Sequence, residues 1–479
     1  MILKIPRSEM IGKIYLCCVA PFIFVWPLQS LAQTPVPMVF NAPQNQLPST
    51  SSTPPAQAQT VLRLADLEQM ALNANPTLAQ AEAAIRAAEG RRVQAGLFPN
   101  PIIGYAGEEL STRAFKDKSE HFVFFEQEIP LGGKLRKSQN ILAQEKLQTE
   151  QAASAQKQRV LNAVRRLYYQ ALGAQTMSEV RQQLVTLTQE AVKTTGELFN
   201  VGQADRPDGL EIEVEQQRAQ IDLLMVENER AQVWQQIGAL IGNPLLQPAS
   251  LAGHLEQGLP LLNQETALAE LLRQSPEIKR VQAGIERAKA TLVRAKAEPL
   301  PDLFVRGGFG YSNEVLESNN PRLAGRRTGP EGKLEVGLRL PLFNRNQGGI
   351  AVAKAELEIA EREKQRLELA LRARLAMTFR EYQNAQQMAE RYEKQIVPRA
   401  QQAYDLYLTR FRQMAAAYPQ VLIAQRTLIQ VRADYIRALV EAWQNAVQIQ
   451  GFLLTGGLDA PMSSDAGPSF GNQPEGGKQ

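Results

Sequence analysis

The hydrophobic pattern of the chain changes its period within residues 333–360. In the first eight residues of this stretch every second side chain is apolar: Leu334, Val336, Leu338 and Leu340. Alternation with a period of two predicts a strand with one apolar and one polar face. After Pro341 and a turn at residues 344–349, apolar positions recur every three or four residues, which predicts an amphipathic helix. The sequence therefore indicates a strand that leads directly into a helix.

The predicted helix covers residues 347–412 and would be about 100 Å long at about 1.5 Å per residue. Pro398 is its only proline. Its apolar or small positions form a near-heptad stripe: Ile350, Ala353, Leu357, Ala360, Leu367, Leu371, Leu375, Tyr382, Ala389, Tyr392 and Ile396. Such a stripe is typical of helices that pack along their whole length. Taken alone, this segment also fits an ordinary coiled coil in solution.

A second strand-to-helix junction lies at residues 122–134, and the chain reads as two copies of one unit. Three prolines recur after 200 residues: Pro76, Pro99 and Pro101 match Pro276, Pro299 and Pro301. Four residues recur after 212: Phe199, Pro207, Leu210 and Asp222 match Phe411, Pro419, Leu422 and Asp434. Agreement of these residues in the same order indicates an internal duplication.

Each unit is predicted to contain a proline-interrupted helix, two strands, a long helix and a returning helix. In the first unit these elements cover residues 64–96, 100–108, 121–129, 135–200 and on to about 240. In the second unit they cover residues 265–296, 302–312, 333–340, 347–412 and on to about 454. We therefore predict a first repeat over residues 61–250, a linker over 251–264 and a second repeat over 265–455.

The strands have the length and the one-sided apolar pattern of strands that cross an outer-membrane-type bilayer. Aromatic side chains are expected to contribute to an interfacial girdle: Phe122, Phe124, Phe125, Phe309 and Tyr311. Four strands are too few to close a barrel, and an open edge in lipid leaves backbone groups without partners. Membrane-spanning strands would therefore require several copies of the chain to share one barrel. The alternative is a small sheet that caps a helical bundle.

The N-terminus has the pattern of a secretory signal peptide over residues 1–32. Three basic residues precede an apolar segment at residues 14–28, and Ser30, Leu31 and Ala32 form a cleavage site of small residues. Both cysteines, Cys17 and Cys18, lie in this segment, so the mature chain has no disulfide or thiolate metal site. Residues 33–60 and 456–479 are rich in Pro, Ser and polar residues and are predicted to be a flexible leader and a disordered tail.

The composition gives little indication of binding or catalytic chemistry. A net charge of +4 over 479 residues does not suggest nucleic-acid binding. His121 and His254 are the only histidines and are far apart, so we expect no metal site and no cofactor. The glycine-rich residues 307–310 lie in a predicted strand and lack the lysine of a phosphate loop. No nucleophile and base are paired, so we expect that the protein is not an enzyme.

In these features the chain resembles the TolC-type outer-membrane factors over residues 62–454. The resemblance rests on the duplication, the two strand hairpins and the sequence Phe199-Asn200-Val201-Gly202 at the end of a long helix. The junctions at residues 130–134 and 341–348 are similar to those of the branch that serves cobalt–zinc–cadmium efflux pumps. The family implies a mainly α fold with a membrane β-barrel: a long periplasmic α-barrel and a twelve-stranded barrel shared by a homotrimer.

The same resemblance implies a passive outer-membrane channel of a tripartite efflux system. Such a channel contacts outer-membrane lipid and docks onto a periplasmic adaptor, which links it to an inner-membrane pump of the RND type. The branch implies heavy-metal cations as cargo, whereas drugs or secreted proteins are the alternatives. A periplasmic coiled-coil adaptor is a further alternative, although adaptors carry a β-rich domain that this sequence lacks.

The family's functional positions lie at the helix tips. Adaptor docking is implied for Val201 and Gly202 and, in the second repeat, for Gln413 and Met414. The family narrows its channel with acidic residues, and the matching positions here make Asp208, Glu211 and Gln420 the candidate gate. Gln420 and Ile423 stand where well-studied members carry aspartates, which puts the usual acidic ring in doubt. The candidate partners of the carboxylates are Arg206, Arg412 and Arg426, although Asp208 near a helix N-terminus is favourable in any helix.

Overall fold

The computed structural model describes residues 61–108, 119–200, 205–316, 325–413 and 418–461. The predicted signal peptide, leader and most of the tail lie outside these ranges, as do Val201, Gly202 and Met414. Among the described helices, none is both long enough and apolar enough to cross a membrane.

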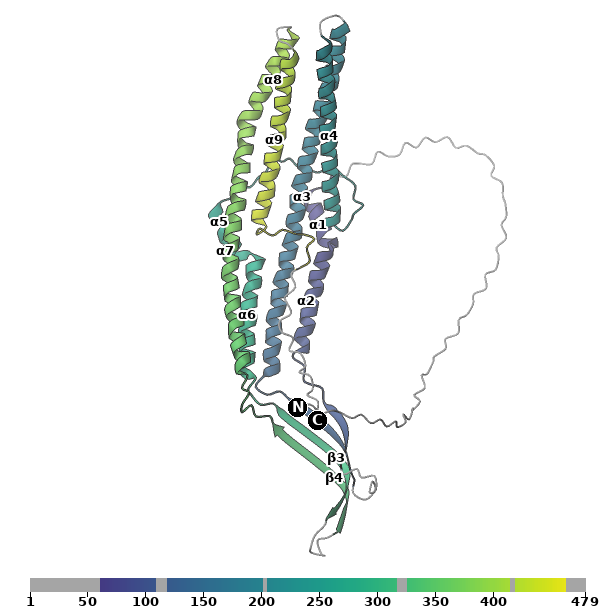
Figure 1. Ribbon diagram of the computed structural model, residues 1–479, viewed down its shortest axis with the longest axis vertical. Coiled ribbons are helices and arrows are strands. Elements are labelled where there is room, and N and C mark those ends of the chain that lie inside the picture. The colour runs from purple at the N-terminus through teal and green to yellow at the C-terminus, as the bar shows by residue number, and fades with distance from the viewer. Residues whose placement is uncertain (1–60, 109–118, 201–204, 317–324, 414–417, 462–479) are drawn as a thin grey trace, which may run out of the picture. The chain divides into compact units, whose positions relative to one another are not determined.

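Four antiparallel strands form one sheet in the order β1-β2-β3-β4 (Figure 1). They are β1 (Ile102–Glu108), β2 (Glu120–Ile129), β3 (Leu303–Leu316) and β4 (Gly325–Leu338). Each half of the chain contributes one hairpin, and β2 pairs with β3 to join the two halves. β4 begins earlier than predicted and ends at Leu338 rather than Leu340. Leu342 N–H donates instead to the carbonyl of Leu340 at 3.0 Å, in a tight turn around Pro341, which has no N–H to donate.

The first half folds into helices α1 (Leu64–Ala74), α2 (Pro76–Gln94), α3 (Lys134–Asn200) and α4 (Arg206–Leu240). Asn75 separates α1 from α2, because its side-chain oxygen Oδ1 accepts from Thr77 N–H at 2.9 Å and caps α2. Its side-chain nitrogen Nδ2 donates to the carbonyl of Leu240 at 2.8 Å. The interruption predicted at Pro76 is therefore a capped boundary that also holds the end of α4.

The second half repeats this order with α5 (Gln264–Gln274), α6 (Pro276–Ala297), α7 (Gln347–Arg391), α8 (Val397–Arg412) and α9 (Tyr418–Gln450). The predicted helix over residues 347–412 is observed, but a π-helical turn, Tyr392–Ile396, lies between its α-helical parts α7 and α8. Pro398 has no N–H to donate to the carbonyl of Lys394, four residues earlier. The backbone accommodates this missing hydrogen bond by forming the π-helical turn just before the proline.

The core lies where α3, α4 and α9 meet the linker between the halves. Trp443 is buried there, donates from its indole to the carbonyl of Leu255 at 2.8 Å, and stacks on Tyr169 with ring centroids 4.0 Å apart. Burial raises the pKa of Tyr169 to about 12, so its hydroxyl remains neutral. A second cluster packs Leu371, Leu375 and Tyr382 of α7 against α5 and α6. The predicted α7 stripe is thus largely buried, except for Ile396.

Several ion pairs cross between the halves, and two of them lie between α3 and α6 and at a strand-to-helix junction. Arg159 of α3 lies 3.1 Å from Glu277 of α6, and both side chains are buried. Lys134, at the start of α3, lies 2.7 Å from Asp302, which precedes β3. Asp302 also accepts from Leu131 N–H at 3.0 Å, so one carboxylate fixes a strand-to-helix junction of the other half.

Candidate functional site

The sheet has an apolar face that is exposed in the single chain. Opposite residues in antiparallel strands point to the same side, and the register pairs Val123 with Phe309 and Gly307 with Leu334. The exposed apolar side chains on this side are Ile103, Val123, Phe125, Phe309, Leu334, Val336 and Leu338. We call this side the apolar face. It contains the alternating apolar residues of the strand predicted around residues 333–340, as far as Leu338.

The opposite side, which we call the charged face, carries ion pairs between strands. Lys333 of β4 lies 3.0 Å from Glu120 of β2 and 3.5 Å from Glu108 of β1. Arg306 of β3 lies 4.0 Å from Glu126 of β2. These contacts join all four strands on one side of the sheet.

Phe122 and Phe124 lie on the charged face, so their predicted place in a lipid-facing girdle is wrong. The ammonium of Lys333 lies 3.9 Å from the centroid of the Phe122 ring, and the guanidinium of Arg306 lies 3.9 Å from that of Phe124. Glycines make room for these rings: a Cβ at Gly104 would overlap Phe124. The cations are therefore held over aromatic faces as well as beside carboxylates. Phe125, Phe309 and Tyr311 remain on the apolar face.

The candidate gate residues are placed at the helix tips farthest from the strands (Figure 1). Asp208 lies in the first turn of α4, followed by Glu211, whose side chain is exposed. Gln420 is exposed in the first turn of α9, and Gln413 is exposed at the end of α8. Val201, Gly202 and Met414 lie outside the described residues.

An ion pair at the tips joins the two halves through residues that the sequence analysis did not combine. Arg426 of α9 donates from Nε to Glu215 of α4 at 2.6 Å, and Arg218 lies 3.2 Å from the same carboxylate. Arg426 therefore pairs with Glu215 rather than with Glu211. Glu215 lies four residues after Glu211 and therefore on the same side of the helix. This spacing is the sequence signal that could have identified Glu215 as a partner of Arg426.

An apolar contact lies beside this ion pair. Ile212 of α4 and Leu422 of α9 are buried together with Ala191 of α3. The hairpin α3–α4 and the hairpin α8–α9 therefore touch through both apolar and charged side chains.

The histidines form no metal site within the described residues. No group of three or more His, Cys, Asp or Glu side chains there is arranged to hold a metal ion. His121 contacts the hydroxyl of Tyr105 through Nδ1, and its Nε2 lies 3.0 Å from the Ser119 hydroxyl.

Comparisons with solved structures show the fold. The chain matches the outer-membrane channel OprN with a TM-score of 0.65 at 19% identity, covering 83% of this chain and 91% of that one. It matches VceC of Vibrio cholerae with a TM-score of 0.64 at 19% identity, covering 83% and 97%. It matches CusC with a TM-score of 0.62 at 18% identity, covering 87% and 99%. The fold is TolC-like, with two structural repeats.

Comparisons of the sequence also find relatives that match most of the chain. The chain is 26% identical over 412 residues to the cobalt-zinc-cadmium resistance protein CzcC of Cupriavidus metallidurans, covering 84% of this chain and 93% of that protein. It is 25% identical over 416 residues to the pyoverdine export outer membrane protein OpmQ of Pseudomonas putida, covering 81% and 84%.

The profile of the family described as "Outer membrane efflux protein" matches residues 67–243 and 267–453, which is most of the chain. The protein is located in the outer membrane, with a long periplasmic helical part. Family and fold are those of passive channels rather than enzymes. The chain belongs to the outer membrane efflux protein family.

Proposed function

We propose that this chain is the outer-membrane channel of a tripartite efflux system and exports heavy-metal cations. It acts as a passive homotrimer that docks through its helix tips onto a periplasmic adaptor and an inner-membrane pump of the RND type. The observation that carries the proposal is the open four-stranded sheet, which has two free edges and an exposed apolar face.

The sheet is suited to closure with copies of itself. β1 and β4 are its edges, and neighbouring strands are antiparallel throughout. β4 of one copy and β1 of the next would therefore also be antiparallel. Three copies supply twelve strands, and a closed ring leaves no backbone edge in lipid.

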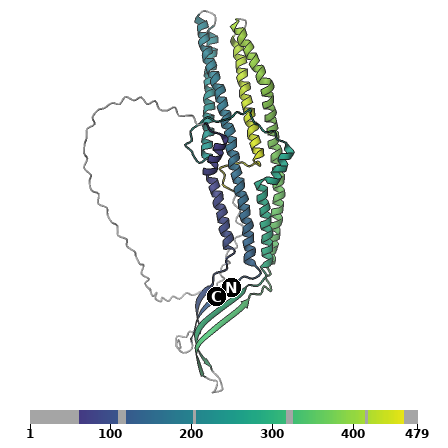
Figure 2. The ribbon, with the colours of Figure 1, turned by 180° about the vertical axis from the view of Figure 1, so that it is seen from behind.

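The helices follow the same lateral order as the strands. Near the sheet, α2 packs on α3, α3 on α6 and α6 on α7, an order that Figures 1 and 2 show from opposite sides. Near the tips, α4 packs on α3, α3 on α9 and α9 on α8. In both layers, as in the sheet, the first half supplies one edge and the second half the other. This arrangement fits a head-to-tail interface that closes into a ring.

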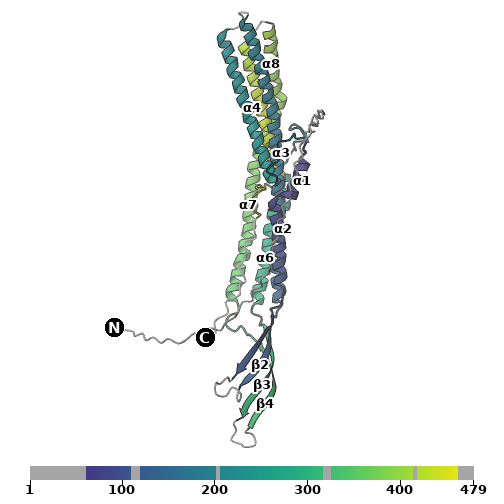
Figure 3. The ribbon, with the colours of Figure 1, turned by 90° about the vertical axis from the view of Figure 1, so that its right-hand side faces the viewer.

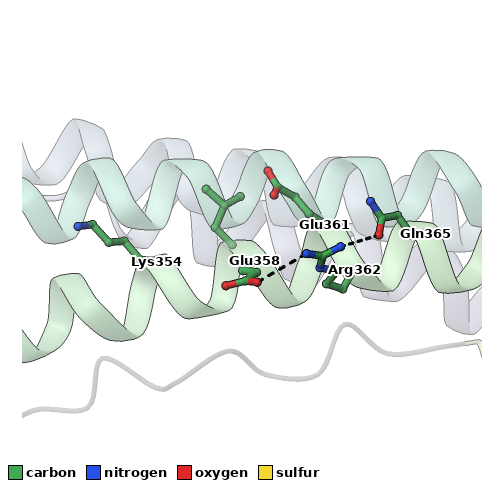
Figure 4. A pocket seen from close by; sticks show the side chains of 6 residues that line it. Lys354, Glu358, Glu361, Arg362 and Gln365 are labelled. Atoms are coloured by element: carbon green, nitrogen blue, oxygen red, sulfur yellow. Dashed lines mark hydrogen bonds and ion pairs between the residues drawn. The ribbon is translucent and has the colours of Figure 1, made fainter.

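The edge helix α7 carries a second stripe besides the buried one. Its exposed members recur at heptad spacing: Val352, Ala355, Ile359, Leu369, Ala373 and Ala376. Beside this stripe, Lys354, Glu358, Glu361, Arg362 and Gln365 line a shallow groove (Figure 4). On the opposite edge, α2 exposes Ala83, Ala87, Gly90 and Val93 at similar spacing. Small residues on one helix and apolar residues on the other favour close packing between copies.

Two observations support cationic cargo. CzcC, which resembles the chain along most of its length, is a cobalt-zinc-cadmium resistance protein by name. On the charged face, among residues whose side chains the structure describes, carboxylates outnumber cations: Glu108, Glu120, Glu126, Glu128, Glu331 and Glu335 against Arg306 and Lys333. In a closed barrel this face would line the pore and attract cations. The resemblance to a pyoverdine exporter favours organic molecules as the second candidate cargo.

Deleting the encoding gene tests the cargo. We expect the deletion strain to lose tolerance to zinc, cobalt and cadmium, and the restored gene to recover it. The restored protein should appear in the outer-membrane fraction as a heat-sensitive oligomer. Unchanged metal tolerance together with lost drug tolerance or lost secretion would contradict the metal assignment. Recovery of the protein as a soluble monomer would contradict the channel itself.

A second experiment tests the gate. In this proposal Asp208 and Glu211 hold the closed channel through cationic or polar partners across the tips, so Asp208→Ala combined with Glu211→Ala is expected to loosen it. An exposed ion pair contributes up to about 1 kcal/mol. A loss of about 1 kcal/mol raises the open population about fivefold, which single-channel recording detects as more frequent opening. Glu215→Ala, which breaks the ion pair with Arg426, is expected to act in the same direction. Glu213→Ala serves as the control, because Glu213 is exposed on the same helix. Equal recordings from all variants would remove the gating role.

A further inference from the structure

The four segments that connect strands with helices all expose large apolar side chains. These are Leu97 and Phe98 before β1, Leu131 after β2, Leu300 before β3, and Leu342 and Phe343 after β4. Phe343 is 92% exposed and Phe98 is 65% exposed. The segments lie between the sheet and the helices (Figure 3). Exposed apolar side chains collected at one level of a molecule indicate an interaction surface.

Exposed cations stand within about one helical turn of these segments. Arg136 is in the first turn of α3, Lys296 is in the last turn of α6, and Arg345 lies two residues before the start of α7. None of the three forms an ion pair with a carboxylate among the residues that the structure describes. Lys134, at the same level, is buried against Asp302 and has a structural partner. The three free cations point to an anionic partner outside the chain.

We propose that these segments form a lipid anchor in the periplasmic leaflet of the outer membrane. The apolar side chains enter the acyl layer as a continuation of the apolar face, and Arg136, Lys296 and Arg345 bind phospholipid phosphates. Long cationic side chains place their charge at the headgroups while apolar neighbours remain in the hydrocarbon. The bilayer thus reaches past the ends of the strands to the first turns of the helices.

A neighbouring copy of the chain does not account for the whole surface. Residues 97–98 and 342–343 adjoin the edge strands β1 and β4, where another copy packs in a ring. Leu131 and Leu300 adjoin the central strands β2 and β3, with an edge strand on either side. Lipid is the partner that reaches central and edge segments alike. The proposal rests on the outer-membrane location and does not depend on the cargo.

Tryptophan fluorescence in proteoliposomes tests the anchor. Phe343→Trp and Leu131→Trp, each in the chain without the predicted signal peptide and its Trp26, add an indole to an edge and a central segment. Trp234 and Trp443 are buried in the helical core and supply a constant background. Phospholipid brominated on its acyl chains should quench both new indoles. The control is Leu261→Trp, because Leu261 is 85% exposed but lies in the linker between the halves, and we expect no quenching there.

The cations are tested by placing the bromine only on phosphatidylglycerol, present as a minor component among zwitterionic lipids. Quenching of the indole at position 343 should correspond to a local fraction of this lipid that is about two to five times its bulk fraction. Replacing both cations, Arg136→Gln with Arg345→Gln, should remove this enrichment. Arg362→Gln, an exposed cation farther along α7, should leave it unchanged.

Several outcomes would overturn the proposal. No quenching at either position would exclude the acyl layer. Quenching at position 131 but not at position 343 would assign the edge segment to a contact between copies. Quenching without enrichment of the anionic lipid would exclude the headgroup role of the cations.

Discussion

Replacing Arg159 with methionine is expected to destabilise the folded helical part by about 3–5 kcal/mol. Arg159 and Glu277 form a pair in which the side chains are 8% and 12% exposed. Arg159→Met keeps the apolar length of the side chain but leaves the Glu277 carboxylate buried without its cation. It also removes the donor to the Gln156 side chain, 3.3 Å away. Guanidinium unfolding of the detergent-solubilised protein, followed by far-ultraviolet circular dichroism, measures the change.

The matched control is Arg362→Met. Arg362 also pairs with a glutamate, Glu358, but at 4.0 Å and with side chains that are 70% and 72% exposed. We expect a change within about 0.5 kcal/mol, since exposed pairs contribute little. Adding Glu277→Leu to Arg159→Met should recover most of the loss, because the unpaired charge is removed. Equal effects of Arg159→Met and Arg362→Met would show that burial does not govern the strength of these pairs.

The variant Gly310→Val is expected to prevent assembly of the sheet. A Cβ at Gly310 would overlap the carbonyl oxygen of His121 and the ring of Phe122, both on the paired strand β2. Overpacking of this kind costs about 1–3 kcal/mol or more, and here it separates β2 from β3, the pair of strands that joins the two hairpins. We expect about a tenfold loss or more of heat-sensitive oligomer in outer-membrane fractions, since 1.4 kcal/mol corresponds to about a tenfold change in an equilibrium.

Gly307→Val, in the same strand, provides the control. A Cβ at Gly307 points to the apolar face, and its nearest neighbour is the Cδ1 of Leu334 at 4.0 Å. Valine fits there, favours the extended backbone and adds apolar surface on the side that faces lipid. We expect oligomer levels close to those of the unsubstituted protein. Loss of the oligomer in both variants would mean that the strand needs glycine for its backbone rather than for space at Gly310.

Much of the fold could be predicted because the decisive patterns are local. Pro76 and Pro276 begin helices where the sequence analysis placed interruptions, and the alternation from Leu334 to Leu338 lies in β4 as expected. Local patterns were insufficient to predict how a helix changes where a backbone hydrogen bond is missing. Pro398 was recognised as the only proline of the long helix, but only the structure shows that the helix adjusts through a π-helical turn.

The candidate site was predicted less completely than the fold. The sequence placed Asp208, Glu211 and Gln420 at the tips, and their functional roles remain predictions. It did not pair Glu215 with Arg426, because the two residues are 211 positions apart and their contact depends on how two hairpins meet. The sequence analysis also assigned Phe122 and Phe125 to the same aromatic girdle, although the two side chains lie on opposite sides of the sheet.

The sequence by itself determined the repeated order of helices and strands and which strand residues are apolar. Periods of two and of about 3.6 are set by backbone geometry, so they can be read without knowing what packs against them. Only the tertiary structure decided that β2 pairs with β3, that Lys333 and Arg306 cover Phe122 and Phe124, and which elements form the free edges. These choices join residues far apart in the chain. They depend on which complementary surfaces meet, and no local period records that.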